Sequence, residues 1–174
     1  KTKFLVSPQG ARCTVELKKK VRFAYQQADD IHLLGYTSEE NHRVIRFNKA
    51  NPELFTDPIL VRYNITKREC QMMIKDAGIE LPMMYRLGYK NNNCIGCVKG
   101  GMGYWNKIRD DFPESFDRMA LTERELGISV LRKNGQSLFL DELPRGVGHY
   151  PSEPDISCGV QCVLFRDTEL PIIT

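Results

Sequence analysis

The sequence has no long apolar run and no strong excess of charge of one sign. No stretch approaches the roughly 18 apolar residues that a bilayer-spanning helix requires, and no secretory hydrophobic region opens the chain. The formal net charge is only +3, which is too small to indicate a nucleic-acid partner by itself. We therefore expect a cytoplasmic protein with no membrane segment, and nucleic acid is not indicated as a partner.

Familiar catalytic and phosphate-binding patterns are also missing. The three histidines, His32, His42 and His149, are scattered and have neither metal-ligand nor triad spacing. Neither G-x4-G-K-[ST] nor G-x-G-x-x-G occurs. Because no initiator Met stands at Lys1, we expect the chain to be a fragment or a processed product.

The cysteines are arranged in a way that indicates a metal site. Four of the six form two close pairs, C-x2-C and C-x3-C. Four thiolates can surround one metal ion tetrahedrally, so we expect Zn(II), with a [4Fe–4S] cluster as the alternative that ligand count does not separate. The alternative to a metal site is that the two pairs are simply reduced or disulfide-linked thiols. The predicted ligands are Cys94, Cys97, Cys158 and Cys162.

The two remaining cysteines and a glycine cluster have less specific interpretations. Cys70 falls on an apolar helical stripe and is expected to pack in the core, whereas a functional thiol at Cys13 is the less favoured interpretation. Glycines between Lys99 and Gly103 precede a predicted helix. They suit either an anion cradle or close backbone packing beside the metal site.

Local signals predict most of the helices and strands. We expect a helix after an N-cap at Thr14, a helix over 66–77 with an inward stripe, and a helix from Pro113 to Gly127. The run 31–34 is expected to be a strand that is buried in a parallel sheet, and the run 59–63 is expected to be another strand or an extended segment. The inward stripe consists of Cys70, Met73, Ile74 and Ala77. Other local signals are the capping boxes Thr37/Glu40 and Thr66/Glu69, the helical stripe Trp105, Ile108 and Phe112, and an Asn134-Gly135 hairpin.

Several segments, in this order, resemble one family. They are Arg12-Cys13-Thr14 with Leu17-Lys18, Gly35-Tyr36-Thr37-Ser38-Glu39-Glu40 with Arg43, Gly78-Ile79 with Leu81-Pro82, Asn93-Cys94-Ile95-Gly96-Cys97 with Tyr104-Trp105, and Cys158-Gly159 with Cys162. The chain resembles, over about residues 10 to 164, the phosphoadenosine phosphosulfate reductase-like proteins of bacteria and phages. These proteins belong to the PP-loop (adenine nucleotide α-hydrolase) superfamily.

The resemblance implies an α/β, Rossmann-like partial sheet over 1–90 and a small helical, Cys-rich metal-binding subdomain over 91–174. It places a nucleotide or sulfonucleotide against Arg12, Cys13, Thr14, Lys18, Glu40 and Arg43. The family's phosphate-binding loop, S-G-G-[KR]-[DT]-[ST], is absent, and Asn41 stands where the family has Ser. The chain therefore resembles the later part of such a protein. We expect that it does not cleave ATP alone, and that its partner is a missing N-terminal half or a separate chain.

The implied chemistry of the intact protein is adenylation or sulfur transfer on a nucleotide-activated substrate. The alternative from another class is a non-enzymatic, metal-stabilised binding or structural module, encoded for example by a phage. A third interpretation, a zinc-ribbon-like nucleic-acid binder, would require a basic face that a net charge of +3 does not indicate.

Overall fold

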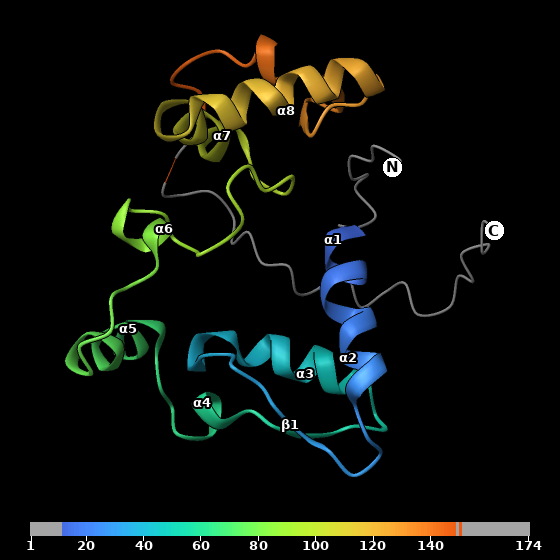
Figure 1. Ribbon diagram of the computed structural model, residues 1–174, viewed down its shortest axis with the longest axis vertical. Coiled ribbons are helices and arrows are strands. Elements are labelled where there is room, and N and C mark those ends of the chain that lie inside the picture. The colour runs from blue at the N-terminus through green and yellow to red at the C-terminus, as the bar shows by residue number, and fades with distance from the viewer. Residues whose placement is uncertain (1–11, 149, 151–174) are drawn as a thin grey trace, which may run out of the picture. The chain divides into compact units, whose positions relative to one another are not determined.

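The computed structural model describes residues 12–148 and 150 of the chain. These residues form two compact units, and the division between them falls in the chain between Leu81 and Pro82. The N-terminal unit is Arg12–Leu81, and the C-terminal unit is 82–148 with Tyr150 (Figure 1). The sequence analysis instead predicts the boundary between the two parts of the chain between residues 90 and 91.

The N-terminal unit opens with a continuous helical segment of α1 (Arg12–Thr14), the π-helical turn η1 (Val15–Lys19) and α2 (Lys20–Tyr25). A helix was predicted here, but the N-cap at Thr14 was wrong. Thr14 has helical backbone angles, φ −68° and ψ −38°, and the helix begins before it. Three apolar side chains recur at helical spacing along this segment, Leu17, Val21 and Tyr25, and they are 50–78% exposed.

A strand–helix–strand unit follows, made of β1 (Ile31–Leu33), α3 (Asn41–Ala50) and β2 (Phe55–Asp57). The two strands are parallel, with Ile31 opposite Phe55. This arrangement makes the chain a mixed α/β protein, as predicted. Ahead of α3, the 3-10 turn η2 (Ser38–Glu40) starts with the predicted capping box, in which the Thr37 N–H donates to Glu40 Oε2 at 3.2 Å.

The prediction that 31–34 is a buried strand was wrong about burial. Side chains of a strand alternate between the two faces of its sheet. On one face Thr56 Oγ1 donates to Asn48 of α3 at 3.0 Å, so α3 lies on that side. On the other face Ile31, Leu33 and Phe55 are 64–69% exposed. Among the described residues, therefore, only one face of the parallel pair is covered.

Two helices complete this unit. Residues 59–62 form α4 (Ile59–Arg62), so the predicted strand there was wrong. The predicted helix at 66–77 is confirmed as α5 (Lys67–Asp76), with Thr66 as N-cap and with Gly78 at φ +70° beyond its end. Its inward stripe is not confirmed, because α5 has no buried residue and Met73 is 58% exposed.

The C-terminal unit contains α6 (Met83–Arg86), α7 (Met102–Asp111), α8 (Pro113–Leu126), the antiparallel strands β3 (Leu131–Lys133) and β4 (Gln136–Leu138), and the 3-10 turn η3 (Leu140–Glu142). Pro113 starts α8 and Gly127, at φ +66°, ends it, as predicted. Asn134 and Gly135 both have positive φ, the signature of the predicted hairpin turn. α6 was not predicted.

The core of the C-terminal unit is continuous, and its largest members come from α7. Trp105 and Ile108 are fully buried, which confirms the predicted stripe. The other buried members are Met84, Tyr89, Tyr104, Phe116, Leu131, Leu140 and Leu143. No helix in the described part of the chain is both long enough and apolar enough to cross a membrane.

Candidate functional site

Cys94 and Cys97 are the first and last residues of one tight turn, which has Ile95 and Gly96 at its centre. Both cysteines are free thiols; Cys94 is exposed and Cys97 is half-buried against the core. Gly96 has φ +72°, a conformation that glycine adopts without steric cost. The turn therefore carries one thiol at each of its two ends, which is the spacing of a C-x2-C metal ligand pair.

The Tyr104 hydroxyl closes this turn. It donates to the carbonyl oxygen of Cys94 at 2.9 Å and accepts the N–H of Cys97 at 2.9 Å. A β-turn is ordinarily closed by a bond between the same two backbone groups. Burial raises the pKa of Tyr104 to about 12, so the hydroxyl keeps its proton at neutral pH. The next residue, Trp105, packs its ring beneath Gly96.

The glycines of the 99–103 loop serve close packing. A Cβ placed on Gly100 would lie 1.9 Å from the ring of Tyr104. A Cβ on Gly148 would lie 2.2 Å from the backbone nitrogen of Gly103, so the chain near residue 148 covers this part of the loop. Of the two interpretations left open from the sequence, these contacts favour packing beside the cysteine turn over an anion cradle.

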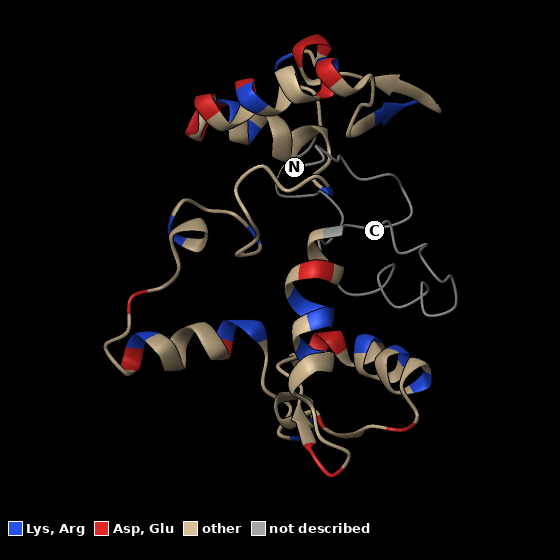
Figure 2. Ribbon diagram, turned by 45° about the vertical axis from the view of Figure 1, so that its right-hand side comes forward, with Lys and Arg blue, Asp and Glu red and all other residues tan. Residues whose placement is uncertain are grey.

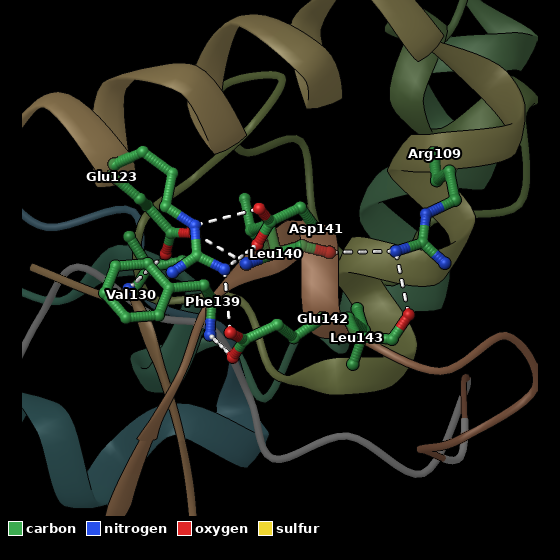
Figure 3. A network of polar contacts seen from close by, with 9 residues as sticks. Arg109, Glu123, Val130, Phe139, Leu140, Asp141, Glu142 and Leu143 are labelled. Atoms are coloured by element: carbon green, nitrogen blue, oxygen red, sulfur yellow. Dashed lines mark hydrogen bonds and ion pairs between the residues drawn. The ribbon is translucent and has the colours of Figure 1, made fainter.

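Polar side chains of α7 hold the segment 140–147 against the core. Arg109 donates to the carbonyl oxygens of Leu140 and Leu143, each at 2.9 Å (Figure 3). Asn106, one turn earlier, donates to the carbonyl oxygens of Pro144 at 3.0 Å and Val147 at 2.9 Å. These four bonds satisfy backbone acceptors of a segment that has little regular structure of its own.

A buried carboxylate of α8 fixes the other side of the same segment. Glu123 is fully buried and accepts the backbone N–H groups of Val130 and of Leu140, the latter at 2.6 Å (Figure 3). Removal from water raises the pKa of Glu123, although the two N–H donors oppose that effect. Arg124, the next residue, pairs with Asp141 and Glu142, both at 2.7 Å.

The end of this segment lies close to the cysteine turn. The Tyr150 hydroxyl accepts the N–H of Lys90 at 2.9 Å. The Tyr150 ring meets Tyr89 edge-on with 5.6 Å between centroids, and Tyr89 in turn meets Tyr104 at 5.9 Å. Two ring contacts therefore connect Tyr150 to the side chain that closes the Cys94–Cys97 turn.

The other two predicted ligands, Cys158 and Cys162, lie outside the described residues. Within 12–148 and 150, no group of three or more His, Cys, Asp or Glu side chains is close enough to hold a metal ion. The four-thiolate site therefore stays a prediction. Cys94 and Cys97 fit two ligands of such a site by residue type, by their shared turn and by the exposure of Cys94.

The predicted nucleotide-binding residues all lie in the N-terminal unit. Arg43 forms an ion pair with Glu40, and its guanidinium stacks on the ring of Tyr36 at 4.5 Å. Among the other predicted residues, Thr14 is buried, whereas Cys13 and Lys18 are exposed on the first helix. Arg12 begins α1.

The remaining thiol, Cys70, is half-buried on α5, and burial raises the pKa of its thiol. A raised pKa keeps a thiol protonated and less reactive.

Sequence reasoning missed three residues that shape the C-terminal unit: Tyr104 as the closure of the cysteine turn, Arg109 and Glu123. The Tyr104-Trp105 pair shortly after Cys97 was visible as a motif. Its hydrogen bonds depend on how α7 packs against the turn, which no local pattern reports.

No protein-family model, curated protein or solved structure matches the chain.

Proposed function

We propose that the chain is a metal-stabilised part of a phosphoadenosine phosphosulfate reductase-like, PP-loop-type protein, with a zinc ion bound by Cys94, Cys97, Cys158 and Cys162. The observation that carries the metal site is the preformed Cys94–Cys97 turn, with the chain that leads to Cys158 anchored beside it at Tyr150.

Chain length is compatible with closure of this site. Only seven residues separate Tyr150 from Cys158 (158 − 150 − 1), and an extended chain reaches about 3.4 Å per residue. Two ring contacts, with centroid distances of 5.6 and 5.9 Å, connect Tyr150 through Tyr89 to Tyr104, which closes the cysteine turn. The second thiol pair is therefore within reach of the first.

A metal held by four thiolates has a structural role, because no coordination position remains open for a substrate. It would tie the C-terminal tail to the α7–α8 core. Zinc satisfies this role without electron transfer, and a [4Fe–4S] cluster is the alternative cofactor.

The nucleotide assignment is supported by the position of Glu40 and Arg43 after the carboxyl end of β1. In open α/β sheets, ligands bind outside the carboxyl ends of the strands. Parallel sheets are ordinarily covered on both faces, whereas the Ile31, Leu33 and Phe55 face of this pair is open in the described chain. We propose that a missing N-terminal half or partner chain completes the sheet, supplies the phosphate-binding loop and permits adenylation or sulfur transfer on an adenine-nucleotide substrate.

One observation favours the alternative, a non-enzymatic metal-stabilised binding or structural module. The guanidinium of Arg43 is already paired with Glu40 and stacked on Tyr36, so a phosphate would have to compete with an internal carboxylate. Nucleotide binding therefore discriminates between the two functions.

Metal content tests the site. Anaerobically purified protein should contain one zinc per chain and should not absorb visible light. A brown protein with a broad absorption band at the short-wavelength end of the visible spectrum would instead indicate the [4Fe–4S] cluster. Cys94→Ser should lose the metal, whereas Cys13→Ser, which removes another exposed thiol, should retain it. Full zinc content in Cys94→Ser would contradict the ligand assignment.

Nucleotide binding is tested by calorimetric titration with ATP and with a sulfonucleotide. We expect no ATP pyrophosphatase activity and weak binding that is lost in the double variant Lys18→Ala/Arg43→Ala. Arg46→Ala/Lys49→Ala removes two other cations, from the exposed side of α3, a helix with no acidic residue (Figure 2), and should bind as the parent does. Complete absence of binding in the parent would favour the structural module.

A further inference from the structure

We infer that Tyr104 is the positioning residue of the thiol pair: its hydroxyl, inserted between the Cys94 carbonyl and the Cys97 N–H, holds the turn in the form that binds metal before the second thiol pair arrives. The inference rests on the proposed metal site and extends it to a residue that is not a ligand.

The geometry of the hydroxyl supports this role. A single oxygen bridges the two backbone groups of a turn whose end residues carry both thiols, with both hydrogen bonds at 2.9 Å. Because one bond is donated and one is accepted, the hydroxyl satisfies both groups at once. Its loss would leave the Cys97 N–H and the Cys94 carbonyl without this bridge.

The ring of Tyr104 is itself held rigidly, so its hydroxyl is a fixed point. The side chain is 1% exposed and makes edge contacts with Tyr89 and Trp105. Gly100 lies directly against the ring, where any larger residue would displace it. A turn attached to such a point loses less conformational entropy when metal binds, and pre-organisation of this kind raises affinity.

Two successive residues of α7 thus contact the same cysteine turn. Tyr104 binds its backbone, and the only tryptophan of the protein, Trp105, packs beneath Gly96. Metal binding at Cys94 and Cys97 should therefore change the fluorescence of Trp105, which provides a local signal.

The first experiment titrates Co(II) into the reduced full chain and follows both the thiolate-to-cobalt charge-transfer band and Trp105 fluorescence. We expect Tyr104→Phe to bind Co(II) about tenfold more weakly, which is within the range expected for loss of the two hydrogen bonds of its hydroxyl. Tyr89→Phe is the matched control, because it removes a buried hydroxyl from the ring next to Tyr104. Equal affinity of Tyr104→Phe and the parent would overturn the inference.

A second measurement keeps this inference separate from the proposed metal site. In a Cys158→Ser/Cys162→Ser background, a trivalent arsenical that bridges two neighbouring thiols should react with Cys94 and Cys97 in the parent and in Tyr89→Phe, and several-fold more slowly in Tyr104→Phe. If the parent binds no metal but this contrast holds, the proposed function fails and the positioning role of Tyr104 stands. Equal rates in all three would refute the positioning role.

Discussion

Gly148 lies directly against Gly103, so close that a Cβ on Gly148 would be 2.2 Å from the Gly103 nitrogen. This contact places Gly148, just after the 140–147 segment, against the start of α7, next to the loop that follows the cysteine turn. Backbone meets backbone here, so neither side can yield by a rotamer change.

Gly148→Ala should therefore destabilise the C-terminal unit. A positive φ of +82° costs about 1–2 kcal/mol for alanine, and overpacking against backbone adds about 1–3 kcal/mol. Gly146→Ala is the matched control, because Gly146 has φ +75° but open space around its Cβ position. Urea unfolding followed by Trp105 fluorescence measures both. Equal free energies of unfolding in the two variants would contradict the close contact.

Burial separates two isoleucines that sequence analysis treated alike. Ile108 is fully buried, so Ile108→Ala should lower the free energy of unfolding by about 2–5 kcal/mol. Ile74 belongs to the stripe that the sequence predicts to be inward, but it is only half-buried on a helix with no buried residue. Its alanine variant should cost about 1 kcal/mol, in proportion to the smaller apolar area removed from contact. A large loss at Ile74 would show that α5 is covered by more than the described residues.

The features that sequence analysis predicted correctly are those set by neighbours in the chain. A Thr and a Glu three residues apart are enough to form the box at Thr66, where the Glu69 N–H donates to Thr66 Oγ1 at 3.2 Å. Asn134-Gly135 likewise specifies its own turn, because both residues tolerate positive φ.

The errors concern properties that depend on distant partners. The apolar run at 59–62 is too short for periodicity to separate strand from helix, and it follows Pro58 as α4. The strand that pairs with β1 is instead Phe55–Asp57, which has no alternating apolar pattern. Burial of Ile31 was inferred from a rule for complete parallel sheets, and the described sheet has two strands. The role of Tyr104 likewise required knowing that α7 packs against the cysteine turn.

Arg109 should tolerate replacement by lysine poorly. One guanidinium nitrogen donates to the carbonyl oxygens of Leu140 and Leu143, and the other donates to Asn106 Oδ1 at 3.1 Å. The planar group also stacks on Phe116 at 4.3 Å, and the single ammonium of lysine cannot reproduce this set of contacts. We expect Arg109→Lys to lower the free energy of unfolding by about 1–3 kcal/mol. Arg145→Lys, at an exposed pair with Asp110, should change it by less than about 0.5 kcal/mol. Similar losses of unfolding free energy for Arg109→Lys and Arg145→Lys in denaturant unfolding would contradict this role of Arg109.

Glu123 should give the C-terminal unit a pH dependence of defined sign. Its pKa is raised in the folded state, mainly by burial, so the folded state binds a proton more readily than the unfolded state. Stability relative to Glu123→Gln should therefore fall as pH rises from the ordinary glutamate pKa through the raised folded pKa, and then level off. Free energies of unfolding between pH 4 and pH 8 test this, with Glu125→Gln, on the exposed side of the same helix, as the control. A parallel pH profile for the parent and Glu123→Gln would refute it.

Zinc should stabilise the C-terminal unit only while both thiol pairs are present. A ligand that binds the folded state alone raises the free energy of unfolding by about 2.7 kcal/mol at a free concentration of 100 times its Kd. The unfolding midpoint read from Trp105 fluorescence should therefore rise with zinc in the parent and in Cys70→Ser, whose thiol lies on α5 in the other unit. Cys97→Ser should lose this rise, because one end of the turn no longer supplies a thiolate.

The double variant Cys158→Ser/Cys162→Ser tests whether the C-terminal tail binds the metal. Its zinc affinity should fall by several orders of magnitude, since only two thiolates remain. If that double variant binds zinc as tightly as the parent, the metal does not tie the tail to the core, and Cys94 and Cys97 bind it with other ligands.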